Sequence, residues 1–220
     1  MPPRHLTPLE ARLLGVLVEK QATVPDSYPL SVNALVMGAN QKTARHPVIE
    51  ATEAEVLTAV DGLKSLGLAF EGSGSRVVRY EHNMARALHL PSQAVALLAV
   101  LMLRGPQTAA ELRLNCERLH RFADISSVEG FLDELAAKPQ PMVLKLARAP
   151  GAREARWAQL LCGEVAQPAG AAHGEGDEGG MGGVSAGEIA ALKAEQTRLA
   201  AEVNELRELV QRLARELGVA

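Results

Sequence analysis

The sequence has few aromatic residues, few cysteines and no long apolar run. Aromatic residues make up 3% of the 220 residues, and the two cysteines, Cys116 and Cys162, belong to no CxxC pair. Their spacing excludes a disulfide framework and a standard zinc site, and it is typical of a reducing cytosol. The longest apolar run, residues 94–103, is short of the roughly 20 residues that cross a bilayer. We therefore expect a soluble cytoplasmic protein without a metal, a cofactor or a membrane partner.

A strong charge of either sign is also missing. The formal net charge is −3 and the isoelectric point is about 6.1, values of an ordinary soluble protein and not of a basic nucleic-acid coat. Only residues 86–163 are basic, with 10 Lys or Arg and 7 Asp or Glu. Residues 163–187 are rich in glycine and contain no Lys or Arg, which predicts a flexible linker.

Helix starts are marked by five capping boxes, in which a Ser or Thr is followed three residues later by Glu. The two side chains satisfy free backbone N–H groups at a helix N-terminus. Each box introduces a run with helical apolar periodicity, so each predicts a helix. The boxes are Thr7/Glu10, Thr52/Glu55, Thr108/Glu111, Ser126/Glu129 and Ser185/Glu188.

The order of predicted elements is helix, helix, helix and β-hairpin, and it occurs twice. In the first repeat the helices begin at Thr7, Ser31 and Thr52, Gly67 ends the third, and strands are expected at 68–71 and 76–81. In the second repeat, residues 97–101 echo residues 13–17, and strands are expected at 142–148 and 153–161. Internal repetition of this kind favours tandem domains. We predict a mainly α fold with small β-hairpin wings, made of winged-helix domains at 1–85 and 86–162.

The C-terminal segment, residues 188–220, has a heptad pattern. Apolar residues alternate in steps of three and four, with Leu at every d position, which favours a parallel coiled-coil homodimer. The alternative is one amphipathic helix packed against its own chain. The a and d positions are Ile189, Leu192, Gln196, Leu199, Val203, Leu206, Val210, Leu213 and Leu217.

Five strings together resemble the YceH-like family of uncharacterised bacterial proteins. They are LTPLEARLLGVLVEK (6–20), YPLSVNAL (28–35), NQKTARHP (40–47), LRGPQT (103–108) and ERLHRFAD (117–124). The resemblance covers roughly residues 5–162. It implies a tandem winged-helix fold and supplies no catalytic residues.

Winged helices often bind DNA by placing the third helix in the major groove. Both predicted third helices are acidic on their polar faces, so conventional readout of bases is not expected. Basic and amide residues lie instead in loops and wings, where they could contact phosphates. The alternative is a solvated rim, or ion pairs with the acidic third helices. The candidate nucleic-acid contacts are Asn40, Gln41, Lys42, Arg45, Arg76, Arg79, Arg118 and Arg121.

Two functions remain open. The first is a dimeric nucleic-acid-binding protein that acts through wings and loops. The second is a protein–protein adaptor that uses winged-helix surfaces and the coiled coil. An enzyme is not expected, because His120, Asp124 and Cys116 show no organised base and orienting group.

Overall fold

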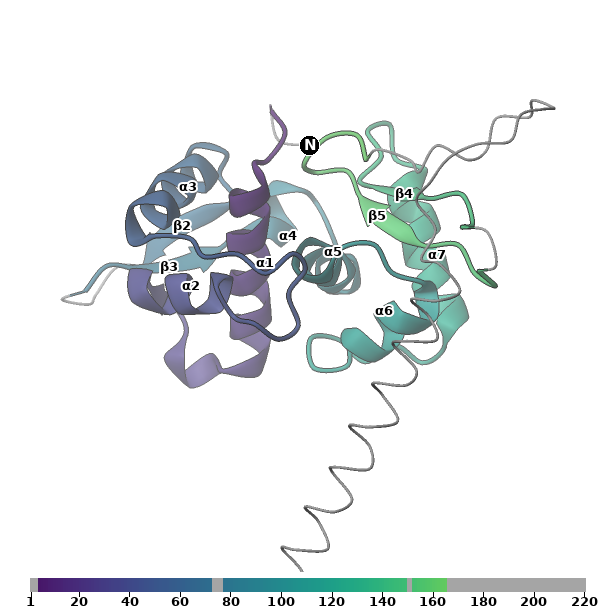
Figure 1. Ribbon diagram of the computed structural model, residues 1–220, viewed down its shortest axis with the longest axis horizontal. Coiled ribbons are helices and arrows are strands. Elements are labelled where there is room, and N and C mark those ends of the chain that lie inside the picture. Colours follow the sequence, from purple (N-terminus) through teal and green to yellow (C-terminus); the bar gives the residue numbers. More distant parts are fainter. Residues whose placement is uncertain (1–3, 73–76, 150–151, 166–220) are drawn as a thin grey trace, which may run out of the picture. The chain divides into compact units, whose positions relative to one another are not determined.

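The computed structural model describes residues 4–72, 77–149 and 152–165 (Figure 1). All of them belong to one compact unit. The predicted coiled-coil residues from Ile189 to Leu217, almost all of the predicted linker, and Arg76 lie outside the described residues.

The first half of the unit contains three main helices and a small sheet. The helices are α1 (Pro8–Thr23), α2 (Val32–Ala39) and α3 (Glu53–Ser65), with a short 3-10 turn at Pro25–Ser27. The strands β1 (Leu30–Ser31), β2 (Ala69–Gly72) and β3 (Arg79–His82) form an antiparallel sheet in the order β1-β3-β2. Phe70 pairs with Glu81 in the β2–β3 register.

The second half repeats this order. After the short α4 (Met84–Ala87) come α5 (Ser92–Arg104), α6 (Ala109–Asn115) and α7 (Ile125–Ala136), and then the antiparallel pair β4 (Val143–Lys145) and β5 (Trp157–Gln159). An isolated bridge between Gln107 and Trp157 corresponds to the β1–β3 pairing of the first half. The prediction of a mainly helical chain with small antiparallel hairpins is confirmed.

Three of the predicted capping boxes are formed. Thr7, Thr52 and Thr108 each accept a hydrogen bond from the backbone N–H of the Glu three residues later, and that Glu accepts one in return. The box at Ser126/Glu129 is wrong. Helix α7 begins earlier, because the Asp124 carboxylate accepts from the Ser127 backbone N–H at 2.7 Å and aspartate is as good an N-cap as serine.

The first predicted strand, 68–71, is shifted by one residue from β2, and the other three predicted strands are longer than the observed ones. Strand β3 begins at Arg79 and the second hairpin pairs only three residues on each side. Sequence missed β1, since two residues are too few for an alternating pattern. The predicted helix end at Gly67 is confirmed, with a φ of +67° that glycine adopts without a steric cost.

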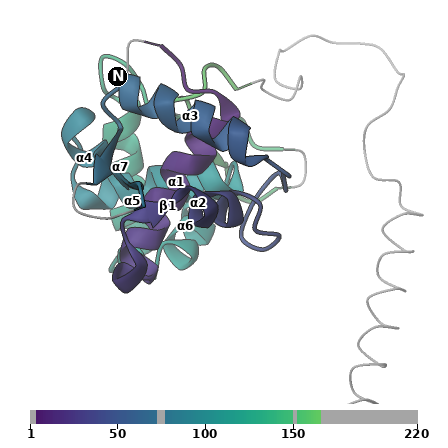
Figure 2. The same ribbon diagram turned by 90° about the vertical axis from the view of Figure 1, so that its left-hand side faces the viewer.

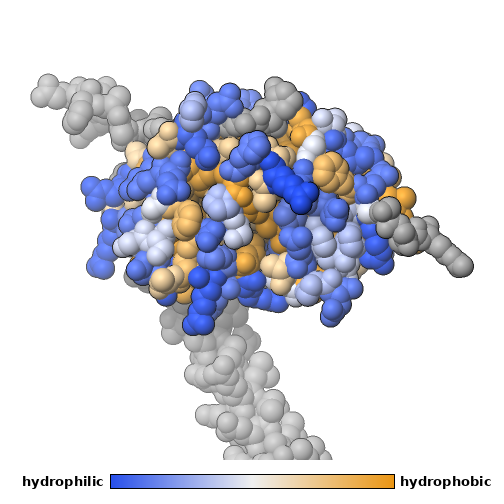
Figure 3. Space-filling model, turned by 180° about the vertical axis from the view of Figure 1, so that it is seen from behind, coloured by the Kyte–Doolittle hydropathy of each residue, from blue (hydrophilic) through white to orange (hydrophobic). Residues whose placement is uncertain are grey.

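Helix α1 is the centre of the core. It packs against α2 and α3 of its own half and against α5 of the other half (Figures 1 and 2). At the crossing with α5, a Cβ added to Gly15 would lie 2.8 Å from Leu103 Cγ, so only glycine allows this approach. The buried residues of both halves form one continuous cluster. The opposite face of the molecule shows apolar side chains near its middle, with hydrophilic ones on both sides (Figure 3).

Candidate functional site

The loop between α2 and α3 holds four of the predicted nucleic-acid contacts, and it is tightly bonded. Asn40 Nδ2 donates to the Ala51 carbonyl at 2.8 Å, and the Ala51 N–H donates to Asn40 Oδ1 at 2.7 Å. The amide of Asn40 therefore closes the loop across its base. Gln41 Nε2 donates to Thr43, and Gln41 Oε1 accepts from Lys20 at 3.5 Å.

Arg45 is not at the surface. Its side chain has no exposed area, its Nη2 lies 2.5 Å from Glu19 Oε2, and its Nε donates to the Gly38 carbonyl at 3.1 Å. A buried guanidinium with these partners cannot reach a phosphate without breaking the loop. Arg45 is therefore not one of the proposed phosphate contacts. Lys42 is exposed, and it has no hydrogen-bond or ion-pair partner among the described residues.

Arg79 also has a structural task. Its Nη1 donates to the Pro29 carbonyl at 2.8 Å, which fixes strand β3 to the segment that leads into β1. The other wing arginine, Arg76, lies outside the described residues. The β2–β3 hairpin thus offers no unbonded arginine within the described part of the chain.

Arg118 and Arg121 differ from these residues. Both are exposed in the loop 116–124 between α6 and α7, and neither has a hydrogen bond or ion pair to the described residues. Arg148, which follows β4, and Arg153, which precedes β5, are exposed and unpaired in the same way. The first turns of α7 and the hairpin border one groove, which is lined among others by Ile125, Glu129, Lys145, Arg148 and Trp157.

The charges of the two halves are therefore arranged differently. In the first half, almost every described cation is bonded to a carboxylate or to a carbonyl oxygen: Arg4, Arg12, Lys20, Arg45, Lys64 and Arg79. In the second half, Arg113 donates to the Ala123 carbonyl and Arg156 pairs with Glu111. Around α7, four arginines remain unpaired within the described part of the chain.

Both third helices expose carboxylates, as the sequence predicts. Glu53, Glu55 and Asp61 are exposed on α3, and Glu129, Asp133 and Glu134 on α7. The alternative was that the predicted contacts form ion pairs with these carboxylates. Among the described residues, they do not. The ion pairs of a third helix found there join Lys64 of α3 to Asp61 of the same helix and to Glu71 of β2.

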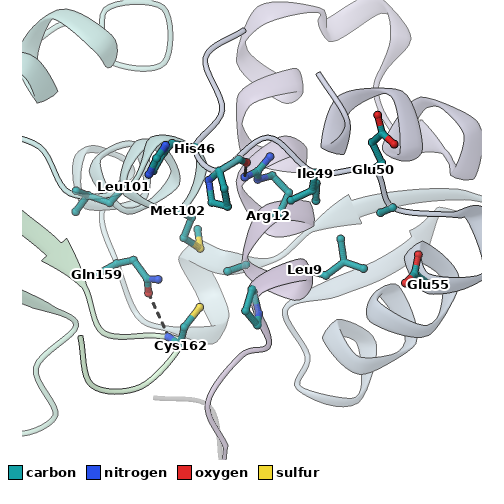
Figure 4. A pocket seen from close by; sticks show the side chains of 15 residues that line it. Leu9, Arg12, His46, Ile49, Glu50, Glu55, Leu101, Met102, Gln159 and Cys162 are labelled. Atoms are coloured by element: carbon teal, nitrogen blue, oxygen red, sulfur yellow. Dashed lines mark hydrogen bonds between the residues drawn. The ribbon is translucent and has the colours of Figure 1, made fainter. Parts of the chain in front are cut away.

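A cavity of about 480 Å³ lies between the N-terminal part of α1, the α2–α3 loop, the end of α5 and the segment after β5. Sequence reasoning missed it, because its walls come from four distant segments. Its lining is mainly apolar, with Leu9, Ile49 and Met102 among the side chains, and Gln159 and Cys162 lie on one side (Figure 4).

Arg12 is the charged residue in the wall of this cavity that is buried most deeply, with 3% of its surface exposed. Its Nη1 donates to the Ala39 carbonyl at 3.0 Å and its Nη2 to the Pro47 carbonyl at 2.5 Å, while its buried Nε has no partner in the described structure. Burial lowers the pKa of Arg12, and the charge of Arg45 lowers this pKa further. One feature of the sequence could have indicated this site, because Arg12 interrupts an otherwise apolar run in α1.

The cysteines and His120 are placed as packing groups. Burial raises the pKa of the Cys116 thiol to about 12, so this thiol is a poor nucleophile at neutral pH. The His120 ring contacts Phe122 edge to face, with centroids 4.8 Å apart. Asp124 caps α7. In the described residues, no group of three His, Cys, Asp or Glu side chains is arranged to hold a metal ion.

These features define a mainly helical protein in which a three-helix and hairpin unit occurs twice. None of the described helices has both the length and the apolar character needed to span a membrane. The chain belongs to the family described as "Protein of unknown function, DUF480", whose model matches residues 6–152. The predicted membership of an uncharacterised bacterial family is confirmed.

Relatives in other bacteria match nearly the whole chain. A UPF0502 protein of Burkholderia pseudomallei is 65% identical over 216 residues, which cover 98% of this chain and 91% of the relative. A UPF0502 protein of Leptothrix cholodnii is 66% identical over 216 residues, which cover 98% of this chain and 97% of the relative. A UPF0502 protein of Burkholderia cenocepacia is also 66% identical, with 98% and 91% covered.

Proposed function

We propose that this chain is a non-enzymatic tandem winged-helix protein whose second half binds the phosphate backbone of duplex DNA. In a winged helix, the turn before the third helix and the wing after it flank that helix and contact phosphates on either side of the groove. Loop 116–124 and the β4–β5 hairpin occupy these two places around α7.

The observation that carries the proposal is the set of four exposed arginines at these places that have no partner in the described part of the chain: Arg118, Arg121, Arg148 and Arg153. An arginine with no partner in the protein keeps its donors available for a phosphate. The carboxylates of α7 disfavour close contact with base edges. The proposed binding is therefore electrostatic and largely independent of sequence, with phosphates and not bases as the contacts.

The test compares charge reversals by fluorescence anisotropy with a labelled 25-base-pair duplex and the full-length protein. Wild type should bind at low salt, and the double variant Arg118→Glu, Arg121→Glu should lose at least about tenfold in affinity. Arg86→Glu is the matched control, because Arg86 is exposed and has no partner among the described residues but lies on α4. If Arg86→Glu loses as much affinity for the duplex as the single variants Arg118→Glu and Arg121→Glu do, the proposed site is wrong.

A second function, docking of a protein partner, is favoured by exposed apolar side chains of the first half. Met37 is 69% exposed on α2 and Phe70 is 47% exposed on β2. A partner cross-linked to wild type in cells should be lost with Met37→Ser, Phe70→Ser and retained with Arg118→Glu, Arg121→Glu. A partner that is retained with Met37→Ser, Phe70→Ser would contradict docking at these side chains.

We also propose that residues 188–220 form a parallel homodimeric coiled coil, supported by their heptad pattern. Deletion of residues 185–220 should convert a dimer into a monomer in light scattering, and a deletion variant that stays dimeric would contradict this. A cytoplasmic location is part of the same proposal, and it is supported by both cysteines being free thiols.

A further inference from the structure

The cavity beside α1 is held in shape by bonds between distant segments. The Leu6 N–H donates to the Leu161 carbonyl at 2.8 Å on one side, and the His46 N–H donates to the Leu103 carbonyl at 2.8 Å on the other. The Asn40 amide fixes Ala51, which lines the wall. A volume of about 480 Å³ is within the range of small-molecule sites that are largely preformed.

The positive charge of Arg12 in this wall has no carboxylate partner among the described residues. The ion pairs of the described residues do not include Arg12, and its hydrogen bonds there go to two neutral carbonyl oxygens. A buried charge is costly unless a group of opposite charge compensates it. The nearby guanidinium of Arg45 is already neutralised by Glu19. An anion in the cavity would supply the missing counter-charge for Arg12.

The carboxylates near the cavity are not partners for Arg12. Glu55 is held in its capping box by the Thr52 N–H and hydroxyl, at 2.8 Å and 2.7 Å. Glu50 is exposed. In Figure 4, Glu50 and Glu55 lie together at one side, and Arg12 lies between them and the side with His46, Met102 and Gln159.

We propose that this cavity binds a small amphipathic monocarboxylate. The anionic group lies beside Arg12, and the hydrocarbon part packs against Leu9, Ile49 and Met102. The site is separate from the arginines around α7, so its test does not depend on DNA binding.

The test uses isothermal titration calorimetry on the full-length protein with octanoate and with octanol as probes. Both share an apolar chain, and only octanoate is charged at neutral pH. Octanoate should bind at least about tenfold more tightly than octanol, because the free energy of a hydrogen bond to a charged group corresponds to a ratio of that size in the dissociation constants. Arg12→Met should abolish the preference, and Arg12→Lys, which retains a positive charge, should keep part of it.

A second pair of variants tests the cavity without removing a charge. Ala51→Leu places a larger side chain in the wall and should weaken both probes, whereas Ala85→Leu makes the same change at an exposed position of α4 and should change neither. The proposal is overturned if octanoate does not bind wild type at millimolar concentration. It is equally overturned if Ala51→Leu binds octanoate as tightly as wild type does. This second criterion applies even if the Arg12 variants fail to fold.

Discussion

The guanidinium of Arg45 lies against the carboxylate of Glu19, with Arg45 Nη2 2.5 Å from Glu19 Oε2. Arg45 is in the loop between α2 and α3 and Glu19 is in the last turns of α1, so the pair fixes the loop to the central helix. The loop is therefore a built wall of the cavity and not an open basic surface.

Removal of Arg45 should destabilise the fold. Arg45→Met leaves the partly buried Glu19 with only its longer contact to Lys20 Nζ, at 3.7 Å, and breaking such a pair costs about 3 kcal/mol. The free energy of unfolding in urea measures this loss. Arg86→Met, at an exposed arginine that no other described residue pairs with, should change stability by less than about 0.5 kcal/mol. Similar values for the two variants would show that the Arg45–Glu19 pair does not hold the loop.

The crossing of α1 and α5 gives a second prediction. Gly15→Ala should destabilise by about 1 kcal/mol or more, because its Cβ would lie 2.8 Å from Leu103 Cγ and 3.3 Å from the Ala99 carbonyl oxygen. Gly130→Ala in α7 is the matched control, since a Cβ there meets no atom within 4 Å. It should stabilise by about 0.5–1 kcal/mol through helix propensity. Thermal unfolding of both variants measures the sign of each change in stability. A stabilising effect of Gly15→Ala would contradict the tight crossing.

Glu10 makes stability depend on pH. Hydrogen bonds from Arg4 lower the pKa of Glu10 below its ordinary value of 4.5, and bonds from Thr7 add to this effect. A carboxyl whose pKa is lower in the folded state adds stability above its unfolded pKa and loses that contribution as the pH falls through its folded pKa. Glu10→Gln should thus cost about 1 kcal/mol at pH 7.

The cost of Glu10→Gln should shrink as the pH falls below about 4.5, because wild-type Glu10 then also becomes neutral. Urea unfolding at pH 7 and at pH 3 measures both values. Glu154→Gln, at an exposed position, is the control and should cost nothing at either pH. A cost that stays constant with pH would assign the role of Glu10 to packing.

The sequence predicted the helices of the fold because local signals mark them. Thr7, Thr52 and Thr108 each cap a helix in the structure, and a capping box depends only on neighbouring residues. Strand limits were less accurate, since pairing such as that of Leu30 with Tyr80 depends on residues far apart in the chain.

The candidate site was predicted less well, for a related reason. Arg45 and Arg118 are both loop arginines next to polar residues, and sequence alone treats them alike. Only the packing of the loop against α1 brings Glu19 to Arg45, while no carboxylate lies against Arg118 in the described structure. The cavity around Arg12 was missed because its lining residues span 8 to 162, and no local pattern links them.

The most direct test of the central claim is the salt dependence of duplex-DNA binding by the full-length protein. Four phosphate contacts predict a slope of about −3 to −4 in a plot of log Kobs against log salt concentration. Arg118→Ala, Arg121→Ala should reduce the magnitude of this slope by about 2, and Arg86→Ala should leave it unchanged. A slope near zero, or the same slope in the double variant as in wild type, would contradict phosphate binding by the arginines around α7.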